Sequence, residues 1–270
     1  MPGKLSRTES LPVQRKAAGS GGGGLMMTPV EAKADPYDFS YAQAVVQKKE
    51  GAPAAGEPLP EVEDDSAEAL LIAFPDFLIE SETPLGKVSG LGHAGVLLIR
   101  KDGLTRYYEY GRYPTKDGTK GVVHKKSVPN VIIGPDGKAT PASLEAVLAK
   151  ISAQSGQHGR IDAAYFQNVN FQVMEAYAQA KLKESNPEFK KDYKKDRDPY
   201  TLTGNNCATF AEDVVTQDKD VDKPSIWVHS PINTVDEYQA EGNATVAYDP
   251  KAKAGERLAI GAFDEADAKK

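Results

Sequence analysis

The chain places its strand-like segments ahead of most of its helix-like segments, and this order limits the folds that are open to it. Short apolar or β-branched runs occupy residues 69–74, 94–100, 105–110, 122–123 and 131–133. Apolar positions at helical spacing follow within residues 140–151, 171–182 and 206–215, with one more strand-like run at 161–166. Grouped strands followed by helices favour an α+β fold over a doubly wound parallel sheet, in which the two alternate.

Local signals place two of these elements. The runs 94–100 and 105–110 are joined by Lys101-Asp102-Gly103, which is typical of a tight turn and predicts a β-hairpin. Thr140-Pro141 predicts the start of the first helix, with threonine as N-cap and proline at the first helical position. After Trp227 we expect an irregular chain.

The composition changes along the chain and predicts three regions. Residues 1–65 contain an almost unbroken glycine run at 19–24 and few large apolar side chains, which predicts a disordered Gly/Pro-rich leader. We expect a folded catalytic domain over residues 66–250 and a flexible tail over 251–270. No stretch approaches the ~20 apolar residues of a transmembrane helix. The N-terminus also lacks the apolar region of a Sec signal peptide.

Charge and motif content exclude several classes of function. The net charge of -6 over 270 residues disfavours nucleic acid as the main partner, because phosphate binding requires a basic surface. The sequence contains no P-loop or dinucleotide fingerprint, and its histidines and single cysteine lack the paired spacing of zinc ligands. We therefore expect no cofactor and no metal. One cysteine cannot form an internal disulfide, so the redox compartment stays open.

The single cysteine has the surroundings of a nucleophile. Cys207 follows two asparagines and begins a predicted helix, Asn205-Asn206-Cys207-Ala208-Thr209-Phe210. An asparagine N-cap places Cys207 in the first turn of the helix. The free N–H groups and the dipole of that turn stabilise a thiolate, which is the reactive form of cysteine. The alternative is a buried structural cysteine, which is the commoner role of an unpaired thiol.

Of the four histidines, His93 has the surroundings of a general base. It lies in Gly90-Leu91-Gly92-His93-Ala94-Gly95, at the start of a predicted strand, where small neighbours leave the imidazole accessible. The alternative is an ordinary histidine at a strand end. For His124, His158 and His229 we predict structural or solvent-exposed roles.

A third polar residue is available to orient the imidazole. Strand alternation places Tyr107, Glu109 and Gly111 on one face of the second hairpin strand, with Tyr108 and Tyr110 on the other. A carboxylate in this aromatic run needs a partner if it is buried, and the hairpin brings it towards His93. The alternative is an edge-strand glutamate that faces water.

These three residues, in this order, resemble a known group of enzymes. A histidine strand, a second strand with glutamate and a later cysteine helix are similar to the circularly permuted papain-like hydrolases of the NlpC/P60 superfamily, the branch with YiiX-like and lecithin:retinol acyltransferase-like proteins. The motifs Gly-His-Ala-Gly, Tyr-Glu-Tyr-Gly-Arg-Tyr and Asn-Cys-Ala-Thr-Phe carry the resemblance, over about residues 69–215. It implies an antiparallel sheet packed on the cysteine helix, with Cys207 as nucleophile, His93 as base and Glu109 as orienting residue. The segment between Gly111 and Asn205 is long for this group, which predicts an unusual substrate groove.

The resemblance also implies a substrate class. Such proteins cleave amides, thioesters or esters, in peptidoglycan stem peptides or in lipids. We therefore predict a cysteine amidase or endopeptidase that acts on peptidoglycan peptides through a thioester. One alternative is an acyltransferase or lipase on lipid esters, with Leu78, Ile79 and Trp227 as candidates for a membrane-facing patch. The other is an inactive binding module.

The predicted leader resembles a further feature of bacterial toxins. A Gly-rich leader ahead of a small hydrolase domain resembles cargo of contractile injection or type VI secretion systems. This implies secretion by a route other than Sec, with a secretion-machine component or an immunity protein as partner. Without such a route the chain is expected in the cytoplasm.

Overall fold

The computed structural model describes residues 66–80, 87–88, 92–112, 120–186, 194, 197–202, 204–241 and 243–261. The leader predicted for residues 1–65 and the last nine residues of the predicted tail lie outside this part of the chain.

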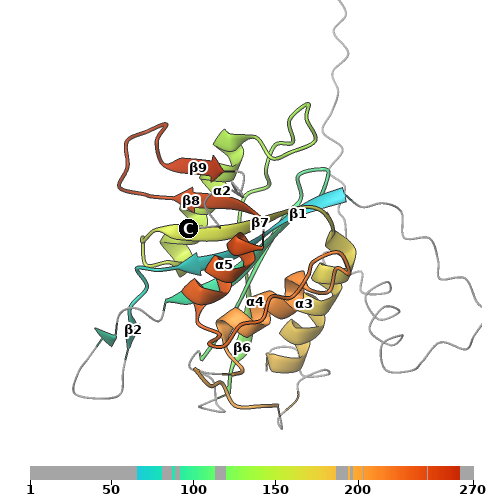
Figure 1. The fold of residues 1–270 in the computed structure, drawn as a ribbon, viewed down its shortest axis with the longest axis vertical. Coiled ribbons are helices and arrows are strands. Elements are labelled where there is room, and N and C mark those ends of the chain that lie inside the picture. Colours follow the sequence, from blue (N-terminus) through green and yellow to red (C-terminus); the bar gives the residue numbers. More distant parts are fainter. Residues whose placement is uncertain are drawn as a thin grey trace, which may run out of the picture. The chain divides into compact units, whose positions relative to one another are not determined.

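The fold is built on a seven-stranded antiparallel sheet (Figure 1). The strands lie in the order β6-β5-β4-β1-β7-β8-β9, so the first strand of the described residues is the central one. Their bounds are β1 Ser66–Phe74, β4 His93–Ile99, β5 Thr105–Gly111, β6 Val122–Lys126, β7 Ile161–Asn170, β8 Ala244–Tyr248 and β9 Leu258–Gly261. A separate two-stranded ribbon pairs β2 (Ile79–Glu80) with β3 (Lys87–Val88).

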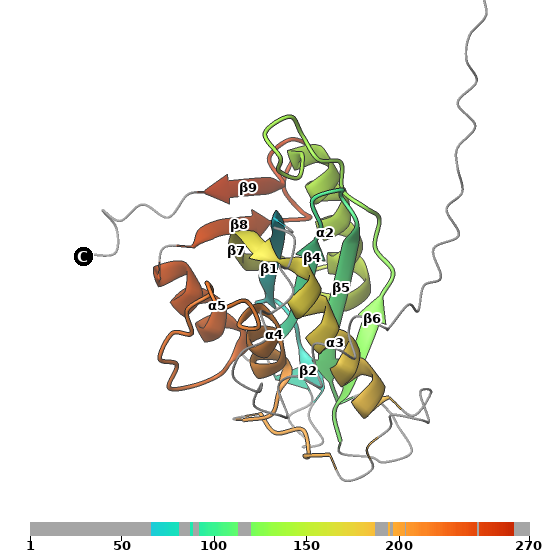
Figure 2. The ribbon, with the colours of Figure 1, turned by 90° about the vertical axis from the view of Figure 1, so that its right-hand side faces the viewer.

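The four helices of the described residues divide between the two faces of the sheet (Figure 2). Their bounds are α2 Pro141–Ser155, α3 Phe171–Ser185, α4 Cys207–Val215 and α5 Pro231–Ala240. Helix α2 packs its buried stripe, with Leu144 and Leu148, against one face. Helices α3, α4 and α5 cover the other face, which places the beginning of α4 beside β4.

Two apolar cores result from this arrangement, one on each side of the sheet. Strand β1 contributes to both, because its successive side chains alternate: Leu70 and Ile72 face α2, whereas Ala69 and Leu71 face α3 and α4. All four are fully buried. The near-continuous apolar run of β1 is therefore that of a strand covered on both faces.

The structure confirms the predicted α+β class and the antiparallel sheet. The hairpin forms between β4 and β5, and the three predicted helices form as α2, α3 and α4. The run at 131–133 was expected to form a strand, but it contributes only one isolated bridge, between Ile133 and Ala139. The Asp136-Gly137 turn brings these residues together without a longer ladder.

The expectation of an irregular chain after Trp227 is wrong. Helix α5 and strands β8 and β9 follow, and β8 pairs with β7 in the main sheet. Strand β9 lies within the range for which a flexible tail was predicted, so residues 258–261 differ from that expectation. The start of α5 repeats the signature of α2, since Ser230 caps the helix and Pro231 is its first residue.

Candidate active site

Cys207 occupies the first turn of α4. Asn206 is the N-cap, and its side-chain oxygen accepts hydrogen bonds from the backbone N–H groups of Ala208 (2.8 Å) and Thr209 (3.1 Å). The Thr209 hydroxyl in turn accepts a hydrogen bond from the Asn206 N–H, which completes a capping box. The helix therefore begins at a fixed residue, with the thiol at its positive end.

His93 is the first residue of β4, next to the start of α4. Gly92 precedes it with φ +68°, a conformation that favours glycine, and an added Cβ there would lie 3.1 Å from the Phe74 carbonyl oxygen. The imidazole stacks on Phe74, with ring centroids 5.8 Å apart, and contacts Phe77 at 5.1 Å. Both rings restrict the orientation of a side chain that is almost wholly buried.

Glu109 lies on β5, and the structure brings its carboxylate to His93. The Nε2 atom of His93 is 3.5 Å from Oε2 of Glu109. Glu109 also accepts a hydrogen bond from the Tyr107 hydroxyl (3.2 Å) and pairs with Lys126 Nζ (3.4 Å). Strand β5 lies between β4 and β6, and Glu109 is only 2% exposed, so the alternative of a water-facing edge residue does not hold.

The pKa values of His93 and Cys207 are shifted by burial and by their neighbours. Burial opposes the charged form of His93, but the hydrogen bond and charge of Cys207, and then those of Glu109, raise its pKa to about 10. Burial likewise opposes the Cys207 thiolate, yet the hydrogen bond and charge of His93 lower the thiol pKa. Tyr200 and the backbone N–H of Ala94 lower it further. The arrangement favours a thiolate–imidazolium pair.

Tyr200 is a contact of the thiol that the sequence reasoning missed. Its hydroxyl donates a hydrogen bond to Cys207 Sγ over 3.6 Å. Burial, followed by the charge of Cys207, raises the pKa of the tyrosine, which keeps it a donor. Tyr200 lies in a loop before α4 without periodicity, so its position depends on tertiary packing, and the sequence offers no signal for it.

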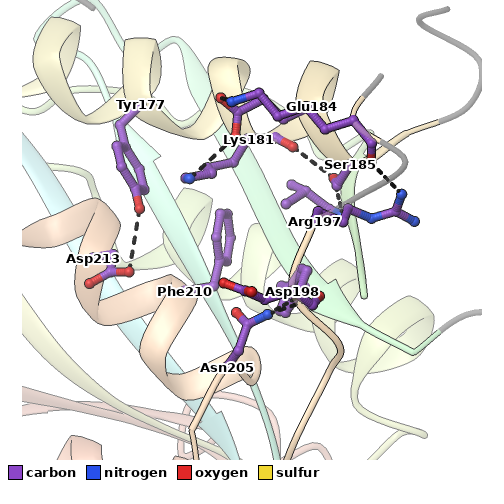
Figure 3. Close-up of a pocket in the computed structure, with 12 residues that line it drawn as sticks. Tyr177, Lys181, Glu184, Ser185, Arg197, Asp198, Asn205, Phe210 and Asp213 are labelled. Atoms are coloured by element: carbon purple, nitrogen blue, oxygen red, sulfur yellow. Dashed lines mark hydrogen bonds and ion pairs between the residues drawn. The ribbon is translucent and has the colours of Figure 1, made fainter. Parts of the chain in front are cut away.

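A cavity of about 360 Å³ lies beside the site, between α3 and α4 (Figure 3). Its lining includes Tyr177 of α3, Asp213 of α4 and Asn205, and the Tyr177 hydroxyl donates to Asp213 over 3.3 Å. Neither Cys207 nor His93 belongs to the lining. Tyr110 does, and its ring lies 5.5 Å from that of Tyr200. Tyr110 at the cavity, Tyr200 and the thiol therefore form a series of contacts.

The three remaining histidines occupy other parts of the fold. His158 has φ +60° in an exposed turn after α2, and His124 lies opposite Glu109 on β6. His229 makes a buried contact that was not predicted, with its Nδ1 atom 3.3 Å from Glu212 Oε2 on α4. Within the described ranges, no three His, Cys, Asp or Glu side chains are grouped to hold a metal ion.

The helices of the described residues were also compared with the requirements of a membrane span. None of them combines the length and the apolar character that crossing a bilayer requires.

Comparison with known proteins gives two matches. A family model described as "Type VI secretion system effector TseH-like" matches residues 69–223. The chain is similar to the crystal structure of the type VI secretion system effector TseH, at 31% identity with a TM-score of 0.61. That match covers 73% of this chain and 98% of the TseH chain. Comparison with curated protein sequences finds no match. The chain belongs to the type VI secretion system effector TseH-like family of secreted bacterial effectors.

Proposed function

We propose that this effector is a cysteine hydrolase of the circularly permuted papain-like type that cleaves amide bonds in peptidoglycan stem peptides. The observation that carries the proposal is the contact series Cys207–His93–Glu109, in which the imidazole interacts with both a thiol at a helix N-terminus and a buried carboxylate. The histidine strand precedes the cysteine helix in the chain, which is the order of the permuted enzymes.

In the acylation step, the Cys207 thiolate attacks the carbonyl carbon of the scissile amide. Because His93 Nε2 faces Glu109, the Nδ1 atom carries the proton that came from the thiol. This proton passes to the amide nitrogen as the C–N bond breaks, and the amine leaves. A thioester then joins the acyl group to Sγ. Glu109 holds the imidazole in the required orientation, as the third member of a triad does.

In the deacylation step, neutral His93 takes a proton from water, and the resulting hydroxide attacks the thioester carbon. Collapse of the intermediate releases the carboxylic acid and restores the thiolate beside imidazolium. The backbone N–H of Cys207, at the start of α4, is suited to stabilise the oxyanion in both steps. A single such donor contributes ~3 kcal/mol in studied acyl-transfer enzymes.

The test is the digestion of purified peptidoglycan sacculi, followed by mass analysis of the released fragments. We expect the wild-type protein to release peptide fragments, and Cys207→Ser and His93→Ala to lower the rate on the order of 10⁴-fold or more. Glu109→Gln keeps the shape of the side chain and removes its charge, so its loss should be smaller. Lys150→Ala, on the exposed surface of α2, is the matched control and should leave the rate unchanged.

Two results would contradict the proposal. Release of the same fragments by Cys207→Ser protein would show that the thiol is not the nucleophile. A wild-type protein that leaves sacculi intact but releases fatty acid from phospholipid vesicles would instead identify a lipase. Thermal unfolding of each variant shows whether a lost activity reflects a lost fold.

A further inference from the structure

The loop before α5 presents apolar side chains to solvent. Trp227 is 97% exposed, and its neighbour Val228 is 55% exposed. Leu202, from the loop before α4, is 56% exposed. An exposed tryptophan followed in the chain by a second exposed apolar residue is a usual mark of a binding surface. We call Leu202, Trp227 and Val228 the Trp227 platform.

The loop that carries Trp227 is anchored to α4 at both of its ends. Glu212 of α4 is fully buried, and its Oε2 atom lies 3.1 Å from Lys223 Nζ and 3.3 Å from His229 Nδ1. Ile226 packs on the core below α4, so the tryptophan next to it points outward. Burying a carboxylate is unfavourable unless its partners are well placed. The two charge contacts, neither of which has hydrogen-bond geometry, join residues on both sides of Trp227 to one residue of α4.

The same loop is joined to the start of the nucleophile helix. The side-chain amide of Asn206 donates to the carbonyl oxygens of His229 (2.9 Å) and Leu202 (3.0 Å). Asn206 is the N-cap of α4 and directly precedes Cys207. The two loops of the Trp227 platform therefore meet at the residue beside the thiol.

We propose that the Trp227 platform binds the glycan strand of peptidoglycan while Cys207 cleaves a peptide attached to that strand. This inference rests on the proposed function, because it names a second contact of the same substrate. The ring faces of a sugar present C–H groups, and an exposed indole offers them a flat and rigid surface at little cost in conformational entropy.

Charge favours an uncharged sugar chain over a membrane as the occupant. The segment Pro224–Ser230 contains no lysine or arginine, and exposed Asp220 and Asp222 precede it. The lysine nearest to it, Lys223, is paired with Glu212. Docking on anionic lipid depends on clustered cations near the membrane-facing residues, and carboxylates at the same place oppose it.

The experiment compares two substrates of different size: intact sacculi, and a synthetic stem peptide without sugar. For Trp227→Ala we expect release from sacculi to fall about tenfold or more, the effect of truncating an aromatic anchor. Hydrolysis of the free peptide should stay within about twofold, as for an ordinary surface substitution. Trp227→Tyr, which keeps a flat ring, should retain most of the activity on sacculi. Ile132→Ala, another exposed apolar position at 68%, is the control and should change neither rate.

Three outcomes would overturn the inference. Equal losses on both substrates would show that Trp227 supports the site or binds the peptide. Unchanged rates on both would show that the platform does not contact substrate. Loss of binding to vesicles that contain phosphatidylglycerol, with unchanged activity on sacculi, would assign the platform to a membrane.

A binding assay separates this inference from the proposed function. Cys207→Ala protein, with and without Trp227→Ala, is sedimented with sacculi. Weaker binding of the double variant supports the platform, even if the wild-type protein cleaves neither substrate. Equal binding of the two proteins contradicts the platform, even if the wild-type protein is an active amidase.

Discussion

At the scale of single residues, the Cys207 thiol and the His93 imidazole shift each other's protonation in opposite directions. The pKa of Cys207 is lowered and that of His93 is raised to about 10. Both shifts favour the thiolate–imidazolium pair over the neutral pair. Since burial alone acts against both charges, the pair depends on the two groups remaining in contact.

The alkylation of Cys207 by iodoacetamide should therefore depend little on pH around neutrality. A free cysteine has a pKa of about 8.5, and only its thiolate reacts. At pH values below that pKa, its alkylation rate therefore rises about tenfold for each unit by which the pH is raised. In His93→Ala protein the strongest influence that lowers the thiol pKa is lost, whereas burial, which raises that pKa, remains. The alkylation rate at pH 7 should therefore be lower than in the wild-type protein, and it should rise steeply with increasing pH. Mass spectrometry of the labelled protein against time gives both profiles.

The control for that experiment is Tyr200→Phe, which removes one hydrogen bond to Sγ and leaves the imidazole in place. Its profile should move to higher pH by less than that of His93→Ala, since the tyrosine contributes less to the thiol pKa. If wild-type Cys207 follows the profile of free cysteine, no thiolate–imidazolium pair exists, and the proposed mechanism is wrong.

At the scale of elements, the packing of β4 on β5 holds the third residue of the candidate triad. Gly95 lies opposite Glu109, and the Tyr107 ring fills the space above the glycine. A Cβ added at Gly95 would lie 2.7 Å from Tyr107 Cε2 and 2.8 Å from Cζ. Gly95→Ala should therefore displace Tyr107 and with it the hydrogen bond to Glu109, lowering the unfolding free energy by about 1–3 kcal/mol. Urea unfolding measures this change.

Tyr107→Phe separates crowding from the lost hydrogen bond. It removes the hydroxyl that donates to Glu109 but adds no atom, so it should lower activity on sacculi with a smaller loss of stability than Gly95→Ala. An unchanged urea midpoint in Gly95→Ala protein would show that the strand pair accommodates a Cβ there. The account of Gly95 would then be wrong.

The elements that the sequence predicted are those with a strong local signal. Periodicity places α2, α3 and α4, the caps at Thr140 and Asn206 support the first and last of these, and the Lys-Asp-Gly turn places the β4–β5 hairpin. The Ser230-Pro231 cap was present too, but α5 has few apolar positions behind it. Strands β8 and β9 are short, and their exposed and buried positions do not alternate cleanly. Strand β8 forms by pairing with β7, and β9 forms by pairing with β8; no local sequence pattern predicts these pairings.

The residues of the candidate site likewise fall into those that a local sequence signal predicts and those that it does not. Cys207, His93 and Glu109 could be chosen because each belongs to a predicted element of known direction, and strand alternation fixes the face of Glu109. Tyr200 and the Glu212–His229 contact could not be chosen, because Tyr200 and His229 lie in loops whose course no periodic pattern predicts. Only the folded chain brings such residues together.

At the scale of the whole molecule, the sheet is completed from both ends of the described chain. Strand β1, the first strand of the described residues, becomes the centre, and the last strands close one side. Helix α5 lies between α4 and those strands in the sequence and packs on β7 and β1. Helix α4 packs on β4, β5 and β1 and also contacts α5, so one late segment of the chain lies directly beside the nucleophile candidate's helix.

Strand β9 covers the edge of β8, and its removal should have a defined effect. A chain that ends at Asp249 loses the pairing of Thr245 with Gly261 and of Tyr248 with Leu258, which exposes the N–H and C=O groups of β8. We expect the unfolding free energy to fall by about 2 kcal/mol, the net value of a few ladder hydrogen bonds. We also expect dimers or larger species at high concentration, because an uncovered strand edge pairs with another. A chain that ends at Gly261 keeps β9 and is the matched control. Urea unfolding and size-exclusion chromatography compare the two, and identical behaviour of both chains would show that β9 contributes nothing to the sheet.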